Sequence, residues 1–113
     1  MPTEIGALTN LEKLDLSENF LEGPIPSELG SLPKLENFYL NHNYLEGSLP
    51  VELFNLANVK GFNVAVNGLE GTLPTEIGKI TLIQWLNTYG NWVSKNWRMY
   101  FLSRESLFIP VRF

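Results

Sequence analysis

The sequence predicts an α/β repeat solenoid built on a parallel sheet of about four short strands. Residues of the same type recur every 24 positions through most of the 113-residue chain. Each period contains one segment in which apolar and polar residues alternate, which is the pattern of a strand. A fixed period of roughly 20 to 50 residues indicates stacked units. Because each unit holds one such strand, the strands of successive units are expected to pair in parallel.

The repeat unit is clearest in residues 35–50, LENFYLNHNYLEGSLP. The same residue types occur 24 positions earlier, in residues 11–26, and 24 positions later, in residues 59–74. The array therefore divides into a half unit at 1–10, complete units at 11–34, 35–58 and 59–82, and a degenerate unit at 83–93.

The first half of each unit predicts the strand, and the second half predicts a bend followed by a short helical turn. Glycine permits the bend because a Cβ atom would resist that backbone conformation. Proline fixes φ where a helical turn can begin. Few residues follow each proline, which favours a single 3-10 turn. The glycines are Gly23, Gly47 and Gly71, and the prolines are Pro26, Pro50 and Pro74.

One asparagine position recurs in four successive units. Where the strand ends, backbone groups without a sheet partner need a donor and an acceptor, and an amide side chain supplies both. Its loss would leave buried groups unpaired, at ~1–3 kcal/mol each. We interpret the position as a structural ladder rather than a row of ligand contacts. Its members are Asn19, Asn43, Asn67 and Asn91.

The complete unit resembles the plant-type leucine-rich repeat, LxxLxLxxNxLxGxIPxxLGxL. The Gly-x-Ile/Leu-Pro step distinguishes this subtype, which is similar to the repeats of receptor-like kinases, receptor-like proteins and polygalacturonase-inhibiting proteins. The resemblance covers residues 1–93. It implies a right-handed superhelix with the parallel sheet on the concave side, 3-10 turns on the convex side and often a second small sheet. Phe54 departs from the pattern, since glycine stands at the equivalent positions 6, 30 and 78.

Both ends of the chain depart from the repeat. The array begins within a unit and lacks the polar cap that solenoids normally need, so we interpret the chain as a piece of a longer array. Residues 94–113 are rich in aromatic and basic residues and no longer follow the period. Three origins stay open for this tail: a cap over the last unit, a contact with a membrane surface, and sequence appended by a misread exon.

Charge and composition exclude several classes of function. Residues 1–94 carry eleven acidic residues and four lysines, a net charge of −7, while residues 95–113 carry +3. An acidic array does not match a phosphate backbone, so no nucleic-acid partner is expected. The absence of cysteine excludes disulfides and thiolate ligands.

The family resemblance implies the cell surface or the extracellular space. The sequence itself contains no apolar run of about 18 residues, so no transmembrane segment is expected. It also shows no signal peptide, no cysteine caps and no Asn-x-Ser/Thr acceptor.

The exposed strand positions form the candidate binding face. Tyr39, Trp85 and Tyr89 offer large contact area at little entropic cost, as binding hot spots do; the alternative is that they only stiffen the sheet by cross-strand packing. Two columns should run across the sheet: Lys13, Asn37, Gly61 and Trp85, and Asp15, Tyr39, Asn63 and Asn87. The candidate ligand-binding residues are Asp15, Ser17, Asn37, Tyr39, Asn41, His42, Asn63, Trp85, Asn87 and Tyr89.

Catalysis and cofactor binding find little support. His42 is the only histidine, and a set with Ser17 and Asp15 would also need a pocket and an oxyanion site. One histidine without cysteine does not make a transition-metal site. We therefore predict no enzyme, no cofactor and no metal. Glutamates that recur in the convex turns are interpreted as charges favoured at helix N-termini: Glu4, Glu28, Glu52 and Glu76.

The sequence thus predicts non-catalytic recognition of a protein, peptide or glycan through the concave sheet, in a receptor-like or inhibitor-like protein. Two alternatives stay open: a scaffold unit that self-associates through uncapped ends, and a fragment of a receptor kinase whose catalytic domain is absent here. Four strands of about five residues span on the order of 300 Å². A stable interface uses ~800 Å² per partner, so we expect weak binding by this chain alone.

Overall fold

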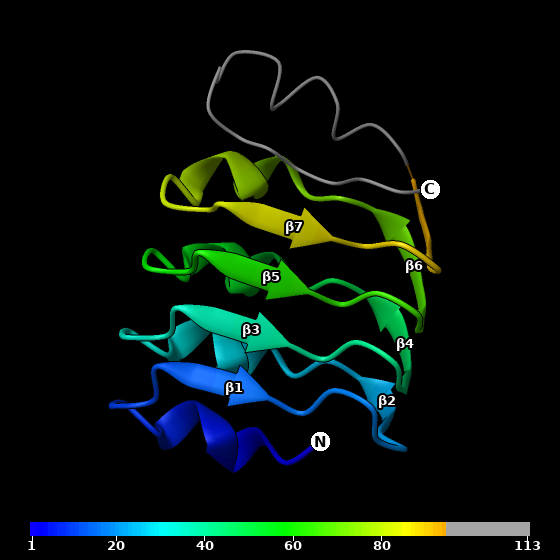
Figure 1. Cartoon of the computed structure of the whole chain (residues 1–113), viewed down its shortest axis with the longest axis horizontal. Helices are drawn as coiled ribbons and strands as arrows, with labels where there is room; N and C mark the ends of the chain where they lie inside the picture. Colours follow the sequence, from blue (N-terminus) through cyan, green and yellow to red (C-terminus); the bar gives the residue numbers. More distant parts are fainter. Residues whose placement is uncertain (95–113) are drawn as a thin grey trace.

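The computed structural model describes residues 1–94 as a stack of similar coils, each with a strand, a second strand and a 3-10 turn (Figure 1). The tail after Ser94, with its three open origins, lies outside the described residues. Sheet A consists of β1 (Lys13–Asp15), β3 (Asn37–Tyr39), β5 (Gly61–Asn63) and β7 (Trp85–Asn87). Sheet B consists of β2 (Glu22–Pro24), β4 (Tyr44–Ser48), β6 (Gly68–Thr72) and β8 (Trp92–Ser94). The turns are η1 (Thr3–Ala7), η2 (Ser27–Ser31), η3 (Val51–Asn55) and η4 (Thr75–Lys79).

The two parallel sheets have different registers. Sheet A pairs residues 24 apart, so Lys13 lies opposite Asn37, as the columns predicted. Sheet B pairs residues 22 apart, so Glu22 lies opposite Tyr44. The pairing therefore shifts by two residues between one sheet and the other, and residues that share a repeat position are not paired directly opposite each other in sheet B.

Sheet A has strands of three residues rather than the predicted five. The backbone turns sharply after each strand and passes through the left-handed region at Glu18 (φ 55°), His42 (φ 56°) and Val66 (φ 54°). Such values are uncommon outside glycine and costly for a β-branched residue. Gly90 occupies the same position in the last unit, at φ 71°. This turn directs the chain from sheet A to sheet B.

The core fills the space inside the coils with leucine, isoleucine, valine and phenylalanine. The Phe38 and Phe62 rings stack with centroids 4.9 Å apart. The core explains why phenylalanine replaces glycine at position 54. The Phe54 side chain is buried there, and its ring centroid lies 6.1 Å from that of Phe62. Glycine is required at the equivalent position in η2, since a Cβ atom on Gly30 would clash with the carbonyl oxygen of Glu52.

Three members of the asparagine ladder, Asn43, Asn67 and Asn91, each join their coil to the preceding one. Asn67 is buried, and its Nδ2 donates to the carbonyl of Val64 in its own unit and to that of Leu40 in the preceding unit, at 3.1 and 3.0 Å. Its Oδ1 accepts from the backbone N–H of Leu45 at 3.0 Å. Asn43 and Asn91 make the equivalent bonds. One side chain thus satisfies backbone groups of two units.

The helices of residues 1–94 are 3-10 turns of five residues, and none of them is long enough to cross a membrane.

We expect Asn67→Ala to lower the free energy of unfolding by roughly 3 kcal/mol or more, because it leaves several buried backbone groups unpaired at ~1–3 kcal/mol each. Asn19→Ala is the matched control, since Asn19 is exposed and its amide donates only to carbonyls of its own unit, those of Leu16 and Ser17. Urea unfolding followed by circular dichroism measures both changes. Equal losses for the two variants would contradict the ladder.

Candidate functional site

The outward face of sheet A carries the candidate site. The middle residue of each strand, such as Phe38, is buried in the core. The first and third residues therefore point away from the core and line up across the four strands. This face combines aromatic, amide and charged side chains.

An aromatic pair forms the centre of the face. The Tyr39 and Trp85 rings lie on β3 and β7, and their centroids are 5.3 Å apart with a tilt of 35°. They meet above Gly61 of the intervening strand β5, where a Cβ atom would lie 2.9 Å from Trp85 Nε1 and 3.0 Å from the Tyr39 hydroxyl. The glycine thus permits two rings from non-adjacent strands to touch. The sequence columns place these residues but do not show this contact.

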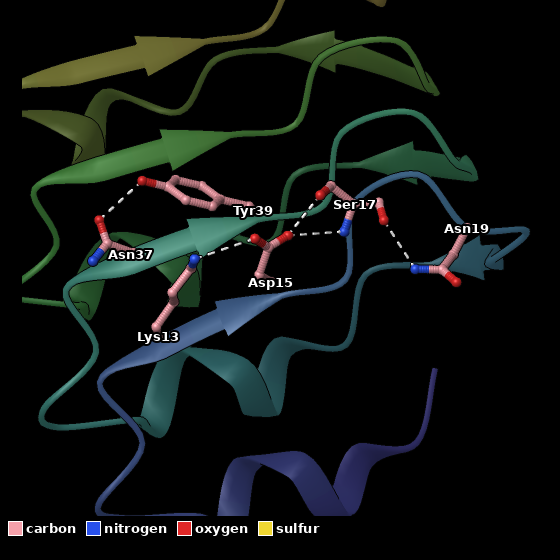
Figure 2. A network of polar contacts seen from close by, with 6 residues as sticks. All are labelled: Lys13, Asp15, Ser17, Asn19, Asn37 and Tyr39. Atoms are coloured by element: carbon pink, nitrogen blue, oxygen red, sulfur yellow. Dashed lines mark hydrogen bonds and ion pairs between the residues drawn. The ribbon is translucent and has the colours of Figure 1, made fainter.

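Two neighbours hold Tyr39 in place (Figure 2). Its hydroxyl donates to Asn37 Oδ1 at 3.0 Å. Lys13 Nζ lies 5.7 Å from the ring centroid, which is within the range of a cation–π interaction. The same Nζ is 3.4 Å from Asp15 Oδ2. The aromatic pair is therefore flanked by a lysine on the β1 side.

Asp15 closes the turn that follows β1. Its Oδ1 accepts from the hydroxyl of Ser17 at 2.6 Å and from the backbone N–H of Ser17 at 3.2 Å (Figure 2). These two hydrogen bonds hold the pKa of Asp15 below its ordinary value, and Lys13 lowers the pKa further against the opposing effect of partial burial. Asp15 is therefore a carboxylate at neutral pH.

Asn63 and Asn87 close the equivalent turns of their units. Asn63 Oδ1 accepts from the backbone N–H of Ala65 at 3.1 Å, and Asn87 Oδ1 accepts from that of Tyr89 at 3.0 Å. Short polar side chains commonly bond the backbone two residues on in this way. These asparagines, like Asp15, therefore stabilise the turn after their strand in addition to lying on the outward face.

The structure separates the ten candidate residues into two groups. Six lie on the strands of sheet A: Asp15, Asn37, Tyr39, Asn63, Trp85 and Asn87. Four lie in the turns beyond the strands: Ser17, Asn41, His42 and Tyr89. Backbone hydrogen bonds still join these turns, as from His42 N–H to the Ala65 carbonyl at 2.9 Å. The turns of successive units therefore stack on one another and extend the face beyond the ends of the strands.

Two residues of the face were missing from the candidate set. Lys13 contacts the Tyr39 ring and Asp15, and Gly61 permits the Tyr39–Trp85 contact. Both stand in the predicted columns, which was the signal available in the sequence. The residue types alone do not indicate these contacts. Both contacts depend on the positions of the aromatic rings, which the sequence does not give.

The outward side chains of sheet A are mainly amides, charged groups and aromatic rings. Residues 1–94 bring together no group of three His, Cys, Asp or Glu side chains that could hold a metal ion. Polar, charged and aromatic groups on a sheet face are suited to non-covalent binding.

Comparisons with known proteins agree with this architecture. The model of the leucine-rich repeat family matches residues 10–32 and 34–56. A comparison with curated protein sequences gives no match. The repeats and the fold of residues 1–94 are those of plant-type leucine-rich repeat proteins, as solved structures show.

Three solved structures illustrate the similarity. That of PEPR1–AtPEP1 shares 31% identity at a TM-score of 0.91 over 96% of this chain. The plant peptide hormone receptor RGFR1 in complex with RGF2 shares 38% sequence identity, with a TM-score of 0.88 over 98% of this chain. The Arabidopsis receptor kinase HAESA, in complex with the peptide hormone IDA and the co-receptor SERK1, shares 30% sequence identity. Its TM-score is 0.80 over 82% of this chain. The chain spans 15%, 18% and 16% of the lengths of these three chains.

We expect Ser17→Ala to raise the pKa of Asp15 towards its ordinary value, because the hydroxyl bond is the largest cause of the lowering. An NMR titration of the side-chain carboxyl carbon measures the change, with the exposed Ser48→Ala as control. In the unsubstituted protein the lowered pKa stabilises the fold above the ordinary aspartate pKa of about 3.9. That stabilisation is lost as the pH falls from there through the lowered pKa. An unchanged titration in Ser17→Ala would contradict the assignment.

Proposed function

We propose that this chain is a recognition module that binds an extended peptide across the outward face of sheet A. The Tyr39–Trp85 pair carries the proposal, because it is a partly exposed aromatic surface in the middle of the face. Aromatic side chains of this kind supply much of the binding energy of protein interfaces. Asn37, Lys13 and Asp15 surround the pair with polar and charged groups that can fix the position of a peptide.

A peptide fits the face better than a bulky partner. The face is four short strands wide. A peptide that runs across the strands would meet both columns of outward side chains. Two similar ectodomains support this choice: RGFR1 is a peptide hormone receptor in complex with RGF2, and HAESA is in complex with the peptide hormone IDA. Those ligands belong to those proteins and serve here only as a precedent.

The size of the face limits the affinity. With three-residue strands, sheet A offers less area than the ~800 Å² per partner of a stable interface. The three solved structures compared above have chains more than five times as long as this one. We therefore propose that residues 1–94 contribute one part of a binding surface and bind only weakly in isolation.

To test this function, a peptide is selected from a random library for binding to the whole chain. Calorimetry then measures the affinity of the chain for that peptide. We expect Tyr39→Ala and Trp85→Ala to weaken binding by roughly 10- to 30-fold each, as loss of a hot spot of about 1.5–2 kcal/mol does. Glu52→Ala in η3 should leave the affinity unchanged, because it lies on the opposite side of the coil. Equal losses from all three variants would refute a site on sheet A.

Gly61→Ala gives a second test that removes no binding group. The new Cβ atom would push apart the Tyr39 and Trp85 rings, which are both within about 3 Å of its position. Weaker peptide binding with intact folding would show that the contact between the rings matters, and not merely their presence.

A further inference from the structure

Sheet B exposes three large aromatic side chains outside the proposed peptide site. The exposed fractions of Phe20, Tyr44 and Trp92 are 81%, 62% and 81%. Tyr44 and Trp92 begin β4 and β8, and Phe20 lies two residues before the start of β2. Exposed aromatic groups that gather on one face mark interaction sites in many proteins.

These aromatic residues share one position of the repeat, and Gly68 occupies that position in the remaining unit. The Phe20 and Tyr44 rings are nearly parallel, with centroids 6.3 Å apart and an angle of 14°. At Gly68 the row is interrupted, and two shallow hollows of about 400 and 410 Å³ lie side by side. Both hollows are lined by Glu46 and Gly68; Tyr44 lines the first and Glu70 the second.

The register of sheet B brings carboxylates to the same row. Because the strands pair at a spacing of 22, Glu46 lies opposite Gly68 and Glu70 lies opposite Trp92. Glu22 lies opposite Tyr44 in the same way. All three glutamates are exposed. Two of the carboxylates thus lie opposite an aromatic residue and Glu46 lies opposite Gly68, an arrangement that a repeat spacing of 24 in both sheets would not produce.

No lysine or arginine of residues 1–94 lies on the strands of sheet B. Lys13 is on β1, Lys79 ends η4, and Lys34 bonds to Asn10. Lys60 forms an ion pair with Glu36 at 2.9 Å. Within the described part of the chain, the three carboxylates therefore lack a neighbouring cationic side chain from sheet B, and an anionic partner would be repelled.

We propose that the outward face of sheet B docks a basic, extended peptide segment of a partner protein, with an arginine or lysine seated over Gly68. A guanidinium group there can stack on the Tyr44 ring and pair with Glu46 or Glu70. The absence of a side chain at Gly68 provides the room. A peptide with a cationic side chain can contact both the aromatic ring and the carboxylates of this surface. A purely apolar segment would cover the carboxylates and leave them without partners.

The probe is a fluorescein-labelled heptapeptide in which arginine alternates with valine, titrated into the whole chain by fluorescence anisotropy. In the comparison peptide every arginine is replaced by citrulline, which keeps the shape and removes the charge. We expect the citrulline peptide to bind at least tenfold more weakly. The double variant Glu46→Gln/Glu70→Gln should weaken binding of the arginine peptide roughly tenfold, since it removes two exposed ion pairs.

Three further variants locate the binding. Tyr44→Ala should weaken the arginine peptide about two- to fivefold through loss of cation–π contact. Tyr39→Ala on sheet A should leave it unchanged, so the outcome is independent of the proposed function. Glu28→Gln/Glu52→Gln, on the turns η2 and η3, removes the same charge elsewhere and should have little effect.

Equal weakening by the two double variants would show a general attraction to an acidic protein and overturn the proposal. Equal binding of the arginine and citrulline peptides would overturn it as well, and so would full binding by Tyr44→Ala.

Discussion

Satisfaction of backbone hydrogen-bonding groups between coils is the constraint on which the rest of the structure depends. Strands of three residues provide few ladder bonds, and the chain leaves each strand through a sharp turn whose backbone groups cannot pair within a sheet. The asparagine ladder supplies the missing donors and acceptors from buried side chains, as Asn67 does for Leu40 and Leu45. A coil is therefore complete only when another coil lies beside it. The hydrophobic core and both sheets rest on this arrangement.

With the coil held in this way, two faces are left with side chains that the fold does not specify. Sheet A presents the Tyr39–Trp85 pair with a lysine and amides beside it. Sheet B presents exposed aromatic rings among carboxylates. The two surfaces differ in charge and in the spacing of their rings. A single short array can thus offer two chemically distinct contacts, because its repeat determines the backbone and the core but not the outward positions.

The sequence predicted the parallel stack, the 3-10 turns and the columns of sheet A, because a period of 24 residues maps directly onto strands that pair at the same spacing. It did not predict the length of the strands, which depends on where the backbone enters the left-handed region at residues such as His42. The register of sheet B depends on the same turn, so the opposition of Glu46 and Gly68 could not be derived from periodicity. The contact above Gly61 requires ring orientations that no pattern of residue types contains. The aromatic position shared by Phe20, Tyr44 and Trp92 is visible in the sequence, but its place opposite the carboxylates of Glu22 and Glu70 follows only from the shifted register.

The ladder also has a consequence for how such an array can change in length during evolution. Each junction consists of the same bonds, from one amide to the carbonyls of its own coil and of the coil before it. Duplication or loss of a whole 24-residue segment re-creates an identical junction, whereas insertion of a single residue moves the amide out of reach of its partners. Gene segments that encode whole units can therefore be copied or removed without the need for a new interface, and the outward residues of a new copy are free to diverge.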